Sequence, residues 1–255
     1  MENNIKTYSS EKVVELYRYL DDPLQKPEER IIELFKDKIS TMNMLDIGVG
    51  GGRTTKYFAP IVQNYTGIDY SSKLIEVCKK KFAALNFITM DVRDLNRFSE
   101  NEFDFVLFSF NGIDYISHKD RLQAFREIKR VLKLDGYFYF SSHNIKSIDN
   151  WKRIKFSLNP LTFASNIRTY FKRKSISNLT VEKINELQKD NYVLVNDGAH
   201  YGELETYYVQ TEFQIKTLVE AGYKNIKVFD LKNGKELKYE EIKNNKDGWL
   251  YYLCN

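Results

Sequence analysis

Cysteine, proline and long apolar runs are all scarce in this sequence. Its two cysteines, Cys78 and Cys254, lie far apart in the chain, which excludes a disulfide framework or a cysteine metal cluster and favours two buried, reduced thiols. No stretch approaches the roughly 20 apolar residues that span a bilayer. The opening stretch, MENNIKTYSSEK, lacks the apolar centre of a signal peptide. We therefore expect a cytoplasmic protein.

The composition is typical of a globular protein. The 255 residues are 42% hydrophobic and 29% charged, and this length supports one large α/β domain with a substantial core. The net charge of +4 is modest and does not by itself indicate a protein that binds nucleic acid.

Strand-like and helix-like segments alternate in the first part of the chain. Short apolar strands are expected at 42–48, 65–69, 86–91, 103–110 and 136–143. Helices are expected between them, at 71–85, at 118–133 and after 53, where Pro60 should end or kink the helix. This rhythm predicts a Rossmann-like α/β fold with a doubly wound, mostly parallel sheet. Strands at 225–230 and 248–254 bring the number to seven, of which the last is antiparallel.

We expect one domain, 1–255, with four parts. Residues 1–40 form a helical cap, because 11–20 and 28–39 are amphipathic, and residues 41–143 form the ligand-binding core. Residues 144–209 break the alternation and are predicted to form a lid inserted after the fifth strand, with a hairpin at its end. Residues 210–255 supply a C-terminal helix and strands.

The stretch LDIGVGGGRTT, residues 45–55, places four glycines between a strand and a helix. Glycine lets the backbone approach a ligand closely, and the helix that follows points free amides at an anion. The glycines do not fit the G-x-G-x-x-G frame of a dinucleotide site, because Arg53 or Thr55 would stand at its third glycine. They fit an acid followed by three alternating glycines: Asp46, Gly48, Gly50 and Gly52. An acid at this place suits a ligand with an ammonium group.

This stretch resembles the first motif of the class I S-adenosylmethionine-dependent methyltransferases. The resemblance implies that Asp46 holds the methionine ammonium group of the cofactor, directly or through water. It also implies that Asp69, at the end of the second strand, binds the ribose hydroxyls, and that Asp91, at the end of the third, contacts the adenine amino group. The cofactor-binding residues predicted in this way are Asp46, Gly48, Gly50, Gly52, Arg53, Asp69, Tyr70, Asp91, Val92 and Ser109.

As evidence for this family, Asp69 and Asp91 are less specific than the glycine turn. The spacing of Asp69 from the glycines also occurs in dinucleotide-binding folds, so a dehydrogenase is the least favoured alternative, and Asp91 could be a helix cap. The turn LKLDG at 132–136 lacks the proline and second glycine that the family usually has there. The resemblance covers about residues 40–143, and more loosely the rest of the chain to its end.

Methylation of a hydroxyl benefits from a general base, which histidine supplies near neutral pH. His143 ends the fifth strand in FSSHN, on the ligand-binding edge of the sheet, and is the predicted catalytic base. His200, beside the hairpin turn, is predicted to reach the substrate, whereas His118 should be a solvated first-turn residue. Asn111 and Tyr115 are predicted substrate contacts, with a core position as the alternative for Tyr115. No recognisable spacing of carboxylates indicates a metal.

Residues 151–174 contain seven basic residues and no acid. One interpretation is attraction for an anionic acceptor, such as a nucleotide-linked or phosphorylated sugar. The plain alternative is a solvated helix face, and a third is contact with a membrane or RNA, because Trp151, Phe156, Tyr170 and Phe171 stand among the charges. No recognisable RNA-binding module accompanies them, which ranks nucleic acid lower.

The sequence therefore predicts an S-adenosylmethionine-dependent methyltransferase acting on a small molecule, by O-methylation of a sugar or nucleotide-linked sugar. GVGGGRTT and FSSHN resemble a bacterial subgroup, some members of which act in polysaccharide biosynthesis. The segment FNGID, 110–114, lacks the prolines with which DNA and protein amide methyltransferases bind a planar nitrogen. The alternatives are an N-methyltransferase of a small amine or amino sugar, and an RNA-associated or non-catalytic protein that binds S-adenosylmethionine.

Overall fold

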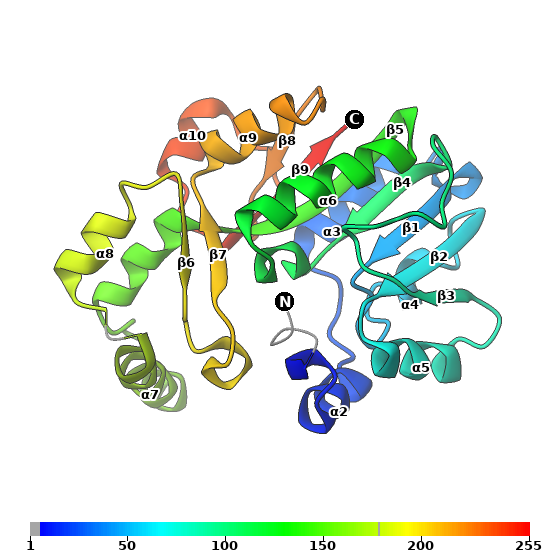
Figure 1. Ribbon diagram of the computed structural model, residues 1–255. Coiled ribbons are helices and arrows are strands. Elements are labelled where there is room, and N and C mark those ends of the chain that lie inside the picture. Colours follow the sequence, from blue (N-terminus) through cyan, green and yellow to red (C-terminus); the bar gives the residue numbers. More distant parts are fainter. Residues whose placement is uncertain (1–5, 178) are drawn as a thin grey trace.

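The computed structural model describes residues 6–177 and 179–255, which form a β-sheet with helices on both faces (Figure 1). The strands are β1 (Asn43–Ile47), β2 (Asn64–Asp69), β3 (Asn86–Thr89), β4 (Phe103–Phe108), β5 (Leu132–Asn144), β6 (Tyr192–Val195), β7 (Thr206–Val209), β8 (Lys227–Phe229) and β9 (Trp249–Cys254). The α-helices are α2 (Glu11–Tyr19), α3 (Lys26–Phe35), α4 (Thr55–Phe58), α5 (Ser72–Lys81), α6 (His118–Val131), α7 (Pro160–Ser177), α8 (Val181–Leu187), α9 (Thr211–Glu220) and α10 (Tyr239–Asn244). Short 3-10 helices are η1 (Ile39–Thr41), η2 (Gly112–Tyr115), η3 (Ile145–Lys152) and η4 (Ala199–Gly202).

The sheet confirms the predicted topology and extends it. β3, β2, β1, β4 and β5 are parallel neighbours in that order, β9 runs antiparallel beside β5, and β8 pairs with β9. The predicted hairpin is present as β6 and β7, but it is not separate from the sheet. β7 pairs with β5 at His143 and Asn144, so the sheet has nine strands instead of the expected seven.

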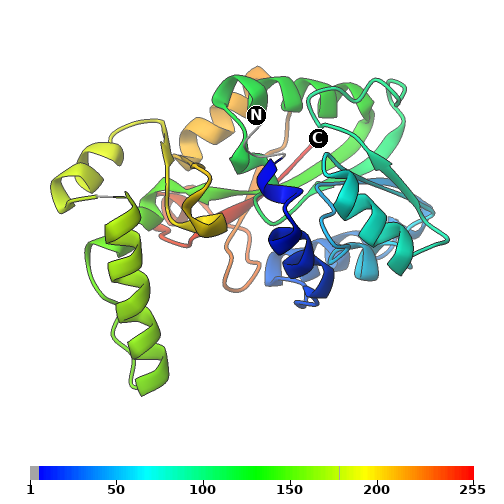
Figure 2. The same ribbon diagram turned by 60° about the horizontal axis from the view of Figure 1, so that its bottom comes forward.

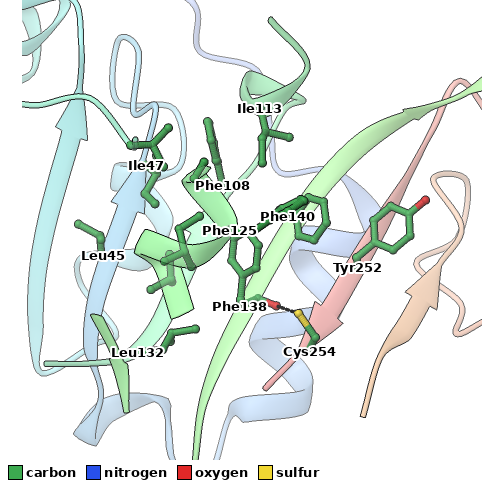
Figure 3. Close-up of a cluster of buried hydrophobic side chains, with 14 of the residues drawn as sticks. Leu45, Ile47, Phe108, Ile113, Phe125, Leu132, Phe138, Phe140, Tyr252 and Cys254 are labelled. Atoms are coloured by element: carbon green, nitrogen blue, oxygen red, sulfur yellow. Dashed lines mark hydrogen bonds between the residues drawn. The ribbon is translucent and has the colours of Figure 1, made fainter. Parts of the chain in front are cut away.

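Apolar side chains fill both faces of the sheet in two clusters. Figure 3 shows the first, in which Phe125 of α6 lies among Phe138 and Phe140 of β5 and Tyr252 of β9. The second lies between the sheet and α3, α4 and α5, and it takes the next residue of β5, Tyr139. This alternation follows the two-residue period of a strand, and each fully buried ring contributes about 1.5–3 kcal/mol. Packing on both faces fixes the strand ends from which the ligand-binding loops start.

The cap and the insertion lie on different parts of this framework. Val14 of α2 packs against Leu74 and Val77 of α5, next to the glycine turn. Residues 144–209 build a small unit past β5, with Ile148 and Ile184 in its own apolar cluster. Its longest helix, α7, projects away from the rest of the molecule (Figure 2).

Several smaller expectations are confirmed. The helix after the glycine turn is short and ends before Pro60, which cannot donate a backbone hydrogen bond and disfavours helix in the residue before it. Cys78 and Cys254 are free and buried. Among the described residues, no helix combines the length and apolarity needed to cross a membrane.

Candidate active site

A cavity lies at the carboxyl ends of β1, β2 and β4, where the strand order reverses between β1 and β4. This topological switch point is where open α/β sheets bind ligands. The described residues lining it come from the cap and the strand ends, and none comes from 144–209. Most of the predicted cofactor residues are among them: Gly48, Gly50, Asp69, Tyr70, Asp91, Val92 and Ser109.

The glycine turn supports both the cavity and the cap. Gly48 and Gly50 have φ values of +65° and +55°, a conformation that favours glycine. A Cβ on Gly50 would lie 2.9 Å from the ring of Tyr17, and one on Gly51 would lie 1.9 Å from the Tyr17 carbonyl oxygen. The turn is therefore glycine-rich partly because α2 packs directly onto it. Gly52 faces elsewhere, since its Cβ would meet the ring of Phe82.

Asp46 is buried beneath this turn. Its Oδ2 accepts hydrogen bonds of 2.6 Å from the hydroxyls of Thr54 and Tyr65. Burial raises the pKa of Asp46 to about 6, although both hydrogen bonds act in the opposite direction. With Arg53, Asp46 lines a small cavity of about 30 Å³ that shares Gly48 and Gly50 with the larger one.

Asp69 stands at the end of β2 with its carboxylate held by the backbone. Oδ2 accepts from the amide of Gly50 at 3.1 Å, and Oδ1 accepts from the amide of Ser71 at 2.8 Å. Burial raises the pKa of Asp69 to about 6. Because a carboxylate oxygen accepts more than one hydrogen bond, both oxygens remain able to bind a diol from the cavity side.

Asp91 lines the cavity with its carboxylate paired to Arg93. The guanidinium Nη2 lies 2.6 Å from Oδ2, and Nε donates to Oδ1 at 2.9 Å. Although partial burial acts against it, this pairing holds the pKa of Asp91 below its ordinary value. Arg93 also lies 3.3 Å from Asp120, another residue that lines the cavity. A hydrogen-bond donor of a ligand that reaches Asp91 would therefore share its carboxylate with Arg93. No motif in the sequence indicated this arginine.

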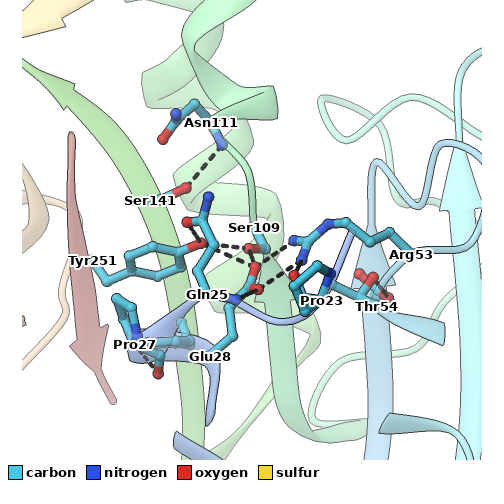
Figure 4. Close-up of polar contacts among 12 residues, drawn as sticks. Pro23, Gln25, Pro27, Glu28, Arg53, Thr54, Ser109, Asn111, Ser141 and Tyr251 are labelled. Carbon is cyan, nitrogen blue, oxygen red and sulfur yellow. Dashed lines mark hydrogen bonds and ion pairs between the residues drawn. The ribbon is translucent and has the colours of Figure 1, made fainter. Parts of the chain in front are cut away.

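Two predicted cofactor residues, Arg53 and Ser109, are bonded to the cap (Figure 4). Arg53 makes a two-bond ion pair with Glu28 of α3, at 2.8 Å and 2.5 Å. Ser109 donates to the same carboxylate, and the hydroxyl of Tyr251 donates to it at 3.0 Å. Glu28 is completely buried, and its charge is balanced by Arg53. The pair ties the glycine turn to the cap helix, and Arg53 lines the small cavity together with Asp46.

The turn after β4 is strained. Phe110 and Asn111 adopt φ values of +56° and +61°, which non-glycine residues rarely do and which cluster at functional sites. Asn111 is buried, its amide donates to Ser141, and its Oδ1 has no hydrogen-bond partner among the described residues. Asn111 is not among the described residues that line the cavity, so its predicted contact with the substrate stays a prediction. Tyr115 lines the cavity and contacts the ring of Tyr8.

His143 does not line this cavity but a second one, of about 640 Å³, between β5 and the insertion. Its Nδ1 and its backbone amide both lie 2.7 Å from Oδ2 of Asp114. The other oxygen of Asp114 accepts from Arg121 at 2.5 Å and from Ser142 at 2.7 Å. Because an ionised carboxylate only accepts, Nδ1 donates to Asp114, and Nε2 is the ring nitrogen left for another partner.

The other two histidines lie on the insertion side of the sheet. His118 is not the solvated residue that the sequence predicted, since its ring stacks on Tyr192 at 4.4 Å and its Nδ1 bonds to Tyr207 at 2.8 Å. His200 belongs to η4, and its side chain is outside the described residues. Its substrate role remains a prediction. Groups of acids, histidines and cysteines able to hold a metal are absent from the described part of the chain.

Residues 45–140 match the methyltransferase domain family. A demethylmenaquinone methyltransferase of Thermotoga maritima is 32% identical over 111 residues, which are 42% of this chain and 46% of that relative. An uncharacterized methyltransferase of Bacillus subtilis, YcgJ, is 33% identical over 107 residues, which are 39% of this chain and 40% of the relative. Residues 45–140 are therefore a methyltransferase domain of this family. The aligned part spans less than half the length of these two relatives.

Solved structures share the fold of this chain over nearly its whole length. An S-adenosylmethionine-dependent methyltransferase from Clostridium acetobutylicum has a TM-score of 0.61 at 19% identity, covering 96% of this chain and 97% of that one. The CcbJ methyltransferase from Streptomyces caelestis has a TM-score of 0.62 at 14% identity, covering 98% and 97%. The similarity therefore includes the cap and the closing strands, which the family match does not reach.

The polar groups of the first cavity fit S-adenosylmethionine, the methyl donor of this family. Asp69 offers two acceptors to a ribose, and Asp46 offers a buried negative charge to an ammonium group. The volume, about 170 Å³, is below the roughly 300 Å³ at which ligand pockets begin. The rings of Tyr8 and Tyr17 narrow the cavity from the cap side. The cavity must therefore widen to hold the whole cofactor.

The raised pKa values of Asp46 and Asp69 predict that cofactor affinity falls in acid. An ammonium group pairs with Asp46 only when the acid is ionised, so affinity should be constant above pH 7 and fall as the pH drops through the pKa of about 6. One such group gives about a tenfold loss at pH 5 relative to pH 7.5. The measurement is calorimetric titration with S-adenosylhomocysteine at both pH values.

Adenosine is the matched ligand for this titration, because it keeps the ribose and lacks the ammonium group. It should lose less affinity than S-adenosylhomocysteine between the two pH values. Equal losses for the two ligands would remove Asp46 from contact with the amino-acid end.

Proposed function

We propose that this methyltransferase transfers a methyl group from S-adenosylmethionine to a hydroxyl group of a small acceptor, with His143 as the general base. The observation that carries the proposal is the contact between His143 and Asp114 at the floor of a large cavity. Transfer to an amine needs only a neutral nucleophile, whereas an aliphatic hydroxyl gains from a base that removes its proton.

Asp114 orients the base. Its Oδ2 accepts from both the backbone and the ring of His143, which sets the ring orientation and leaves Nε2 directed away from the carboxylate. Asp114 is itself completely buried and is held by Arg121. The ion pair holds the carboxylate in place, where it stabilises the imidazolium formed when His143 takes a proton.

The reaction needs little more from the chain than placement. Bound S-adenosylmethionine supplies an electrophilic methyl group. The acceptor oxygen forms the new bond to this methyl carbon as the sulfur–carbon bond breaks, and the hydroxyl proton goes to Nε2 of His143. The ring of Trp249 lies between the two cavities, with centroids 5.8 Å from His143 and 6.2 Å from Phe110.

We further propose that the hydroxyl belongs to a sugar. A cavity of about 640 Å³ accommodates one or two sugar rings, and the tryptophans and tyrosines in its lining offer the flat apolar faces on which sugars pack. N-methylation of a small amine or amino sugar is the competing function, which the same experiment distinguishes.

The test is a screen of sugars, nucleotide sugars and small amines with cofactor labelled in its methyl group. We expect label on a hydroxyl-bearing acceptor, with a mass gain of one methyl. Transfer only to amines would replace O-methylation by N-methylation. Binding of the cofactor without transfer to any member of the panel would contradict the enzymatic proposal.

A further inference from the structure

The second cavity combines aromatic walls with an unusual density of cations. Both tryptophans of the chain, Trp151 and Trp249, line it, and so do Tyr170 and Tyr208. Five basic side chains also line it: Lys152, Arg153, Lys155, Lys174 and Lys246. Against them stand two carboxylates in the lining, Asp197 and Asp247.

The cations fall into two groups. Lys152 and Lys246 share Asp149, with Lys246 at 2.6 Å, and together they lower the pKa of Asp149 to about 2. Arg153, Lys155 and Lys174 make no ion pair with any described residue. Three positive charges at one cavity are thus left without a counter-ion in the described part of the chain.

The two lining carboxylates do not neutralise this charge at close range. Asp197 accepts from the hydroxyl of Tyr208 at 2.6 Å and from the amide of Ala199 at 2.8 Å. Asp247 accepts from the amide of Leu231 at 3.0 Å. Their oxygens are occupied in holding the walls of the cavity, and each bond is to a neutral donor.

We propose that this cavity binds the phosphate or diphosphate group of the acceptor, through Arg153, Lys155 and Lys174. The inference rests on the proposed function, since it places the anionic group of the acceptor in the same cavity as His143. Guanidinium and ammonium groups form strong charge-assisted hydrogen bonds to phosphate oxygens, and the aromatic walls accept a sugar or base ring. The acceptor class is a phosphorylated or nucleotide-linked sugar.

The cations of the insertion are divided between two faces, which supplies a matched control. Lys155 and Lys174 line the cavity, whereas Arg168 and Lys172 of α7 are exposed and do not line it. Removing either pair takes two positive charges from residues 155–174. General electrostatic attraction would respond to both pairs alike, but a phosphate site responds only to the first.

The test uses tryptophan fluorescence, because every tryptophan of the chain lies at this cavity. Inorganic pyrophosphate and uridine diphosphate glucose are titrated into the full chain without cofactor, with glucose as the neutral probe. We expect a saturable change with both anions and a smaller one with glucose. Equal affinity for both anions indicates a phosphate ester, and tighter binding of the nucleotide sugar indicates a nucleotide-linked acceptor.

Lys155→Ala with Lys174→Ala should weaken binding of both anions at least about tenfold, since each lost charge-assisted bond contributes about 1.5–3 kcal/mol. Arg168→Ala with Lys172→Ala should change it less than about twofold. No fluorescence change with either anion, or equal weakening by the two double variants, would overturn the inference.

This readout is independent of methyl transfer. Methylation of neutral sugars by a chain that does not bind pyrophosphate would leave the proposed function and remove the phosphate site. Anion binding by a chain that methylates nothing would leave the phosphate site and remove the proposed function.

Discussion

Replacing His143 with alanine should lower turnover of a hydroxyl acceptor about 100-fold or more and leave cofactor binding unchanged. General bases contribute about 100- to 10,000-fold to a rate, and His143 lines the second cavity while its Nδ1 is bonded to Asp114. His143 does not line the cofactor cavity, so the dissociation constant of S-adenosylhomocysteine should stay within about twofold of wild type. Turnover is followed by transfer of label from the cofactor.

His118→Ala is the control for this variant. His118 also contacts tyrosine rings on the insertion side of the sheet, but it lines neither cavity. Its loss should change turnover little. Wild-type turnover by the His143 variant on a confirmed hydroxyl acceptor would remove His143 from the chemistry and favour a reaction that needs no base.

Replacing Asp69 with alanine should weaken cofactor binding about 100-fold or more. The carboxylate is expected to hold two ribose hydroxyls, and each hydrogen bond to a charged group contributes about 1.5–3 kcal/mol, while every 1.4 kcal/mol is a factor of ten. Asp69 also accepts from the amide of Gly50, so its loss loosens the glycine turn as well as removing the diol contact. The measured quantity is the dissociation constant of S-adenosylhomocysteine.

Asp104→Ala is the matched control for Asp69→Ala. Asp104 stands at the other end of its strand, accepts from the backbone amide of Asn43 at 2.9 Å, and lies away from the cofactor cavity. It should affect thermal stability and leave cofactor affinity within about twofold of wild type. Equal loss of affinity in both variants would show that Asp69 acts only through the stability of the fold.

The part of the site that the sequence predicted is the part built by local structure. A strand that ends in an acid and a glycine turn places Asp46, Gly48 and Gly50 wherever that strand lies in the sheet. Asp69 follows in the same way from the end of the next strand. These positions needed no knowledge of how distant segments pack.

The rest depends on contacts between distant segments. Asp114 and His143 come together because β4 and β5 are neighbours and the turn after β4 folds back over the end of β5, which no spacing in the sequence records. Arg53 pairs with Glu28 because α3 lies against the glycine turn. The predicted hairpin joins the main sheet, because β7 pairs with β5 beyond the last residue that β4 pairs. Long-range pairing of this kind also explains why His118, predicted to be solvated, stacks on Tyr192 of β6.

Calorimetric titration of S-adenosylhomocysteine into the wild-type chain, Asp69→Ala and Asp104→Ala most directly tests the assignment of the first cavity. We predict saturable binding at one site for wild type and Asp104→Ala, and a loss of about 100-fold or more for Asp69→Ala. Absence of heat and of any shift in melting temperature with the wild-type chain, or undiminished affinity in Asp69→Ala, would contradict it.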